Sequence, residues 1–290
     1  MTLQPNQHSQ IPQPAFNPAM LPFSGFDGLG GIDDARNIQV RETTPLEKLL
    51  EVGKELVREY FDKHLVEMDV YDVCDMYDEY ESRYIPFYNE VRKRLNETNF
   101  NEDDIASLVL AEANNEYEVN DQLVLGVYTG CLASLLTEKN KKEGKRTKIH
   151  IDGKGNVFHF LFLFARDVDD IIIENLTGAW IGGFVASHGG HANDLIAQNI
   201  IVYSLFADAG SNYGSTNKLI CTKIKGDKVL YSALSNGGKS SQVIGVDIEG
   251  NDALMFIGDT TSSDITTGTI EQVVGVGIRK GTFTLSFCPC

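Results

Sequence analysis

The chain has 290 residues, of which 41 are acidic and 25 basic, and its formal net charge is -16 at pH 7. This balance argues against nucleic-acid binding, which needs clustered Lys and Arg, and against docking on an anionic membrane. The five cysteines are an odd and sparse set that does not describe a disulfide scaffold. At roughly 150 residues per domain, the length suggests one or two domains.

Residues 1–42 are rich in Pro, Gln, Asn and Gly and show neither helical nor strand periodicity. We expect them to form an extended or disordered tail. The first basic residue is Arg36, and no apolar run has the length of a signal peptide or a transmembrane helix. The sequence therefore predicts a cytoplasmic protein.

Residues 43–138 carry the signals of a small acidic α-helical domain. Thr44, Pro45 and Glu47 form a capping box with proline at the first helical position, and leucines follow at the spacing of one helix face. This pattern predicts a helix that begins directly after Thr44.

Further helices are predicted along the same region. A helical pattern runs over residues 70–84 and should end or kink at Pro86. Asn101, followed by three acidic residues, should open another helix, and Asn120 should open the last one. A basic, polar segment at 139–146 is the expected linker to the second half of the chain.

Acidic side chains cluster within the helical pattern. They are Asp69, Asp72, Asp75, Asp78, Glu79 and Glu81. Such a cluster can form a docking face for a basic partner or bind a divalent cation. Charge runs are more often a solvated face that keeps the protein soluble.

The second half of the chain contains a repeat. Each copy begins 24 residues after the one before, at positions 170, 194, 218 and 242. The copies are Asp170–Leu176, Asp194–Ile200, Lys218–Ile224 and Gln242–Ile248, and Gln272–Ile278 follows after a longer interval. Residues 148–151 and 157–164 should supply an earlier coil.

Within each copy, β-branched runs alternate with Gly, Asn, Asp and Ser turns, and no helical stretch intervenes. Strands that return after a fixed short interval stack in parallel and form a β-solenoid. Asn175 and Asn199 predict an asparagine ladder at an inner turn. A second strand is expected at 178–186, with Trp180 and Phe184 on one face.

In coil length, asparagine position and strand sequence, residues 147–287 resemble the single-stranded right-handed parallel β-helix superfamily, the pectin-lyase-like fold. The resemblance implies an α+β chain, mainly β, with about 24 residues per coil. The helices at 43–138 would then form a cap domain on the first coil of a β-helix domain at 147–290. The superfamily includes polysaccharide lyases and hydrolases, viral spikes and iron–sulfur assembly scaffolds, so the fold does not choose an activity.

The polygalacturonase-like members of that superfamily place an Asp pair near a His, followed later by a basic pair. The counterparts here are Asp169 and Asp170, then His188 and His191, then Arg279 with Lys280. Two carboxylates can hydrolyse a glycoside as acid and base. The chain departs from the family because it lacks the Asn-Thr-Asp segment and has His-Gly-Gly-His in place of Gly-His-Gly. In the alternative interpretation, Asp170 is only the polar residue that opens a strand.

His188, His191 and Asp194 recur at three-residue spacing and offer a possible ligand set for a divalent metal such as Zn or Fe. Cys288 and Cys290 add two thiols. The alternative is a glycine-rich turn with histidines that face solvent. No other cofactor is expected.

Five aromatic residues follow the repeat: Trp180, Phe184, Tyr203, Phe206 and Tyr231. They would form either an exposed stacking stripe for sugars or, as their alternation with Ile and Leu favours, a ladder in the core.

The leading interpretation is a non-enzymatic, intracellular β-solenoid that acts as a scaffold or binding protein. We expect a protein partner or self-association, because solenoid ends need a cover. The alternative is a carbohydrate-active enzyme of the pectin-lyase-like class. The third hypothesis is a metal-binding or iron–sulfur assembly scaffold.

Overall fold

The structure is a computed structural model that describes residues 42–60, 84–258, 268–280 and 284–285. Several predictions fall outside these ranges. They concern the tail up to residue 41, the acidic cluster between Asp69 and Glu81, the helix at 70–84 except its last residue, and Cys288 and Cys290. The helices are α1 (Pro45–Tyr60), α2 (Ile85–Arg94), α3 (Glu102–Glu112) and α4 (Val119–Lys142). The strands are β1 (Lys148–Asp152), β2 (Asp167–Glu174), β3 (Thr177–Gly178), β4 (His191–Val202), β5 (Ser215–Gly226), β6 (Lys239–Glu249), β7 (Met255–Ile257), β8 (Thr269–Val276) and β9 (Thr284–Leu285).

Two of the predicted helix starts are confirmed. The hydroxyl of Thr44 accepts a bond of 3.2 Å from the N–H of Glu47, and the Glu47 carboxylate accepts one of 2.8 Å from the N–H of Thr44. Asn101 and Asp104 form the same reciprocal box at the start of α3. Each box satisfies backbone donors that the first helical turn leaves unpaired.

Three predicted boundaries compare with the structure as follows. Pro86 lies in the first turn of α2, where its missing N–H is not needed. The helix predicted to end or kink at Pro86 lies outside the described residues. The last helix begins at Val119, one residue before Asn120, and no side chain caps it. Because α4 continues to Lys142, the predicted linker at 139–146 begins inside a helix.

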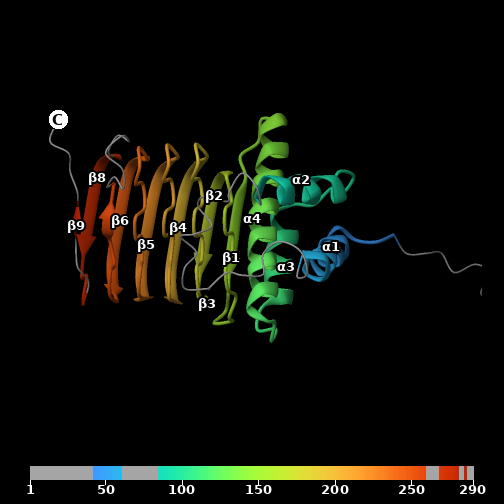
Figure 1. Cartoon of the computed structure of the whole chain (residues 1–290), viewed down its shortest axis with the longest axis horizontal. Helices are drawn as coiled ribbons and strands as arrows, with labels where there is room; N and C mark the ends of the chain where they lie inside the picture. The colour runs from blue at the N-terminus through green and yellow to red at the C-terminus, as the bar shows by residue number, and fades with distance from the viewer. Residues whose placement is uncertain (1–41, 61–83, 259–267, 281–283, 286–290) are drawn as a thin grey trace, which may run out of the picture. The chain divides into compact units, whose positions relative to one another are not determined.

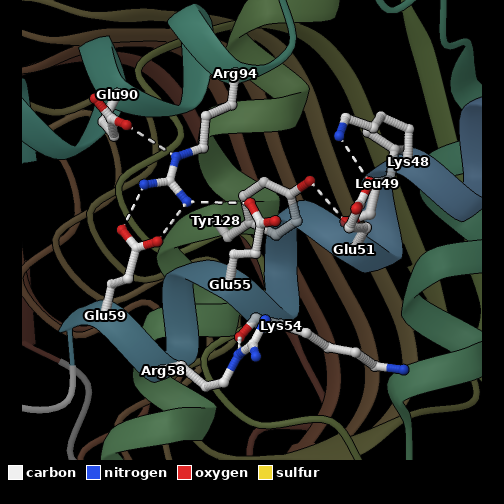
Figure 2. A network of polar contacts seen from close by, with 10 residues as sticks. All are labelled: Lys48, Leu49, Glu51, Lys54, Glu55, Arg58, Glu59, Glu90, Arg94 and Tyr128. Atoms are coloured by element: carbon white, nitrogen blue, oxygen red, sulfur yellow. Dashed lines mark hydrogen bonds and ion pairs between the residues drawn. The ribbon is translucent and has the colours of Figure 1, made fainter.

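An ion-pair network joins α1 to α2 (Figure 2). The guanidinium of Arg94 on α2 contacts Glu90 on its own helix at 2.9 Å and, across the interface, Glu59 at 2.5 Å and Glu55 at 3.3 Å. Nearby, the buried hydroxyl of Tyr128 on α4 donates to the carbonyl of Leu49 on α1 at 2.9 Å. These contacts fix the helices to one another around an apolar core.

Helix α4 packs against the first coil of the solenoid (Figure 1). The hydroxyl of Thr129 accepts from the N–H of Phe162 at 3.0 Å, and the hydroxyl of Ser134 accepts from the N–H of Arg166 at 2.9 Å. Within the described residues α4 is the one helix long and apolar enough to cross a membrane, and most of it is buried inside this protein.

The solenoid sheet confirms the repeat. Its parallel strands follow the order β1-β2-β4-β5-β6-β8, seen as a row of stacked arrows in Figure 1. Asp170 pairs with Asp194, Asp194 with Lys218, and Lys218 with Gln242, as the 24-residue spacing predicts. Lys148 pairs with Asp170 and adds the expected earlier coil.

The asparagine ladder is confirmed at the first bend of the coil. The side-chain amide of Asn199 donates to Asn175 at 2.8 Å, and that of Asn175 donates to Asp152 at 2.9 Å. Asn175 and Asn199 have φ values of 53° and 54°, a conformation that asparagine tolerates better than most residues. The ladder lies at the surface, not at an inner turn, because Asn175 is only half-buried and Asn199 is exposed.

The predicted second strand at 178–186 is wrong. In its place the chain makes consecutive turns in which every second residue has a positive φ, for example Trp180 at 52° and Phe184 at 55°. The preceding coil and the next two coils have the same conformation, and we call these segments (160–165, 180–188, 206–212 and 230–236) the turn wall. Bonds between coils, such as Phe184 N–H to Ala207 C=O at 2.9 Å, join its layers. Trp180 and Ile181 are both buried, so the expected alternation of faces is absent there.

The turn wall contains a polar column in which His188, Asn212 and Asn236 occupy equivalent positions of successive coils. The Asn236 amide donates to Asn212 at 3.1 Å. All three residues have φ values between 52° and 53°. Burial, with a smaller contribution from Arg166, lowers the pKa of His188 to about 4.

We expect His188→Asn to raise the free energy of unfolding by about 1 kcal/mol at pH 7.5, because it gives the buried amide of Asn212, which has no partner among the described residues, an acceptor. The gain should grow as the pH falls. Between pH 6.5 and about 4 the unfolded chain protonates His188 while the folded chain does not, which destabilises the native protein. Urea unfolding at pH 7.5 and pH 5 measures both effects.

His191→Asn is the control, since His191 is exposed. Its stability should stay within about 0.5 kcal/mol of the native value at both pH values. A loss of stability in His188→Asn would show that the amide of Asn212 does not donate to position 188 of the polar column. The same gain at both pH values would show that protonation of His188 does not contribute.

Candidate functional site

The four residues predicted for glycoside hydrolysis do not share one site. Asp170 accepts from Arg146 at 2.6 Å and from Asn193 at 2.8 Å. Burial favours a higher pKa for Asp170, but these hydrogen bonds outweigh it and hold the pKa below its ordinary value. The Asp170 carboxylate is therefore an ionised group held within a structural network.

Asp169 and His191 do line one groove. It has a volume of about 420 Å³ and lies where α2 and α4 meet the start of β2, with Arg166 also in its wall. Asp169 accepts from the backbone N–H of Thr147 at 2.7 Å, and Nδ1 of His191 lies 3.0 Å from the hydroxyl of Ser215. One carboxylate oxygen of Asp169 is thus already used to hold β2 to the residue directly before β1.

The residues predicted to hold a metal contact different partners. His188 lies in the turn wall, with Nδ1 2.9 Å from the hydroxyl of Ser187. Asp194 accepts from Asn217 at 3.0 Å and lies 3.9 Å from the amino group of Lys218. Nowhere in the described part of the chain do three His, Cys, Asp or Glu side chains gather in a way that could hold a metal ion.

The aromatic residues divide between core and surface. Trp180, Phe184 and Phe206 are buried, as the core interpretation predicted. Tyr203 and Tyr231 are half-buried, and the amino group of Lys228 lies 5.6 and 5.4 Å from their ring centroids and 6.0 Å from that of Trp180. Sequence reasoning missed Lys228, although it stands two periods after Trp180.

The outer face of the sheet carries a continuous apolar stripe that sequence reasoning also missed. Successive strands contribute one aliphatic residue each, and these residues pair along the sheet. They are Ile172, Ile196, Ile220, Ile244 and Val274, which we call the aliphatic row. All five are half-buried. Reading the second residue after each repeat start would have revealed the row.

Polar side chains border the aliphatic row. On one side the amide of Asn217 donates to Asp194 at 3.0 Å, and the amide of Gln242 donates to Gln272 at 2.7 Å. On the other side Glu174 lies 2.8 Å from His150. The face is therefore an apolar centre that polar side chains border in part, and Val246 and Val276 extend the apolar surface on β6 and β8. An apolar centre with a polar rim is the composition of a protein interface.

The chain was compared with protein-family models, with curated proteins and with solved structures, and none of them matches. The fold and the outer face define a parallel β-solenoid with helices packed on its first coil.

Proposed function

We propose that this chain is a non-enzymatic, cytoplasmic scaffold that associates with a second copy of itself through the outer face of its sheet. The aliphatic row carries the proposal. Five consecutive strands present an aliphatic side chain at the same place, and a contiguous apolar patch on a protein surface marks an interaction site.

The spacing of the row favours a second copy over an unrelated partner. Parallel strands are stacked about 4.8 Å apart, so the row offers one aliphatic knob at each step of that length. Side chains of a facing surface interdigitate at every step only where that surface has the same repeat. Another copy has it by construction, and two such sheets pack face to face about 10 Å apart.

The hydrogen bonds of the candidate catalytic residues also support a scaffold. Asp170 is held in a structural network, Asp169 bonds to the backbone of Thr147, and His188 is in the turn wall. If the chain were a carbohydrate-active enzyme, it would have to act in the groove lined by Asp169 and His191. That groove contains only one residue of the predicted Asp pair and one of the predicted His pair.

The proposal includes two further features of the architecture. The solenoid is right-handed, the hand that connections between parallel strands take in almost every known case. The helices act as its cap, since α4 lies on the first coil and bonds to its backbone through Thr129 and Ser134.

The experiment is to measure the mass of the full chain in solution by light scattering, with and without Ile220→Lys. Ile220 is central in the aliphatic row and only half-buried, so the charge should be tolerated in the folded monomer. We expect the native chain to dimerise and the variant to be monomeric, because an unpaired ammonium buried in an apolar interface costs several kcal/mol.

Ile201→Lys is the matched control. Ile201 is 58% exposed and stands on β4, beyond the bend and outside the aliphatic row. This variant should dimerise like the native chain. A monomeric native chain, or dissociation by Ile201→Lys but not by Ile220→Lys, would refute the proposed interface.

A further inference from the structure

A cavity of about 220 Å³ lies between the loop that joins α3 to α4 and the first coil. Glu112, Tyr117, Gln122, Leu125, Phe158 and His159 are among the residues that line it. We call it the Glu112 pocket. It is separate from the groove with Asp169 and from the outer face of the sheet.

The loop over the Glu112 pocket is fixed to the first coil through Asn114. The N–H of Asn114 donates to the carbonyl of Val157 at 2.9 Å, and its side-chain oxygen accepts from the N–H of Val157 at 2.7 Å. Its amide donates to Asn156 at 2.7 Å. Asn114 has a φ of 60°, a left-handed conformation that persists only where surrounding contacts impose it. The pocket is therefore a formed feature of the fold.

Glu112 supplies a buried carboxylate without a charged partner. Only 7% of Glu112 is exposed. Its Oε2 atom accepts from the hydroxyl of Tyr117 at 2.6 Å and from the amide of Asn115 at 2.9 Å, and both donors are neutral. Among the described residues no cation lies within ion-pair distance of Glu112, and Oε1 accepts no hydrogen bond. A carboxylate buried in this way is costly unless a cation joins it.

The surroundings of the Glu112 pocket are negative. No lysine, arginine or histidine occurs between Leu95 and Glu138, and Glu116, Glu118 and Asp121 follow Glu112 closely in the chain. Burial and the nearby charge of Glu118 raise the pKa of Asp121, as expected where negative potential accumulates. Anions are therefore disfavoured here, and cations are attracted.

The remaining polar groups of the pocket are suited to accept hydrogen bonds. Burial lowers the pKa of His159, so its neutral ring has a nitrogen that can accept. The amide nitrogen of Gln122 donates to the carbonyl of Tyr117 at 2.6 Å, which leaves the side-chain oxygen as an acceptor. Burial and the bond to Glu112 raise the pKa of Tyr117 to about 12, which keeps its hydroxyl a donor to Glu112.

We propose that the Glu112 pocket binds a small primary alkylammonium ion. The ammonium group, a donor of three hydrogen bonds, lies at Glu112, and the alkyl chain packs on Leu125 and Phe158. The cavity volume equals that of about seven water molecules, which suits an ammonium group with a short carbon chain.

The test is calorimetric titration of the full chain with n-butylammonium chloride in physiological salt, alongside 1-butanol, which has the same shape without the charge. We expect n-butylammonium to bind at least about tenfold more tightly than 1-butanol. Glu112→Gln keeps the size of the side chain and removes its charge, and it should weaken n-butylammonium binding by about tenfold or more.

Glu116→Gln makes the same charge change on an exposed residue of the same loop and should weaken n-butylammonium binding much less than Glu112→Gln does, because solvent and salt screen an exposed charge. If circular dichroism shows that Glu112→Gln does not fold, His159→Phe becomes the deciding variant, and it should weaken n-butylammonium binding severalfold. Equal binding of 1-butanol and n-butylammonium, equal losses in Glu112→Gln and Glu116→Gln, unchanged affinity in His159→Phe, or full displacement by potassium chloride would each overturn the proposal.

Discussion

Gly214→Ala is expected to lower the free energy of unfolding by about 3 kcal/mol or more, beyond the usual range for an added methyl group in a packed interior. A Cβ atom at Gly214 would lie 1.9 Å from the carbonyl oxygen of Ala186 in the preceding coil and 2.9 Å from that of Ser211. Both obstacles are backbone atoms, which cannot rotate away. The coils would have to separate against the hydrogen bonds of the sheet and of the turn wall.

The same corner of other coils is also glycine, at Gly190, Gly238 and Gly268, where an added Cβ would lie 2.5, 2.3 and 2.2 Å from a backbone oxygen. Gly189→Ala is the control. Gly189 has a φ of 73° but no atom within 4 Å of an added Cβ, so alanine there should cost only about 1 to 2 kcal/mol of backbone strain. Urea unfolding compares the two variants, and an equal or smaller loss in Gly214→Ala would show that the coils can move apart.

Asp208→Asn is expected to stabilise the protein by about 2 kcal/mol at pH 8 and to have no effect near pH 3.5. Burial raises the pKa of Asp208 from its ordinary 3.8 to about 7, and the positive charge of Lys228 only partly opposes this. Between pH 3.8 and about 7 the carboxyl group of Asp208 keeps its proton in the folded chain and loses it in the unfolded chain. The free energy of unfolding therefore falls as the pH rises through this range. The expected stabilisation is smaller than the full pKa shift would give, because Asp208 is half-buried and solvent screens its charge.

Unfolding of both proteins by urea at pH 3.5 and pH 8 tests this result. Asp167→Asn is the control, because Asp167 is exposed and should change stability by less than about 0.5 kcal/mol at either pH. A gain in Asp208→Asn that is the same at both pH values would mean that the ionised carboxylate is not the cause. A loss at pH 8 would mean that the attraction to Lys228 outweighs the cost of burial.

The sheet of the solenoid was predictable because its signal is local and repeated. Asp170, Asp194, Lys218 and Gln242 each open a β-branched run, and a fixed spacing leaves little choice of register. The turn wall was not predictable from the same pattern. The continuous apolar run after Gly178 fits a buried strand as well as the turns that form there. The positive φ of Trp180 or Phe184 has no sequence signal.

The candidate sites were less predictable because they depend on where the chain turns a corner. His188 and His191 are three residues apart, but the bend at Gly190 places the first in the turn wall and the second at the start of β4. The Glu112 pocket forms where the loop after α3 meets the first coil, and no local motif encodes that contact. Glu112 itself looked like one acidic residue among many on a charged helix.

The parallel sheet and the turn wall of each coil also constrain how this chain can change its length during evolution. Residues of the sheet and of the turn wall are held by backbone bonds to the neighbouring coil, and equivalent residues from β2 to β6 are 24 positions apart. Duplication or loss of one whole repeat adds or removes a single step from the aliphatic row, the glycine corner and the polar column together. Insertion of one residue within β4 would instead turn the following inward side chains to the outside. We therefore expect this protein to vary in length by whole repeats, so that its outer face grows or shrinks by one coil at a time.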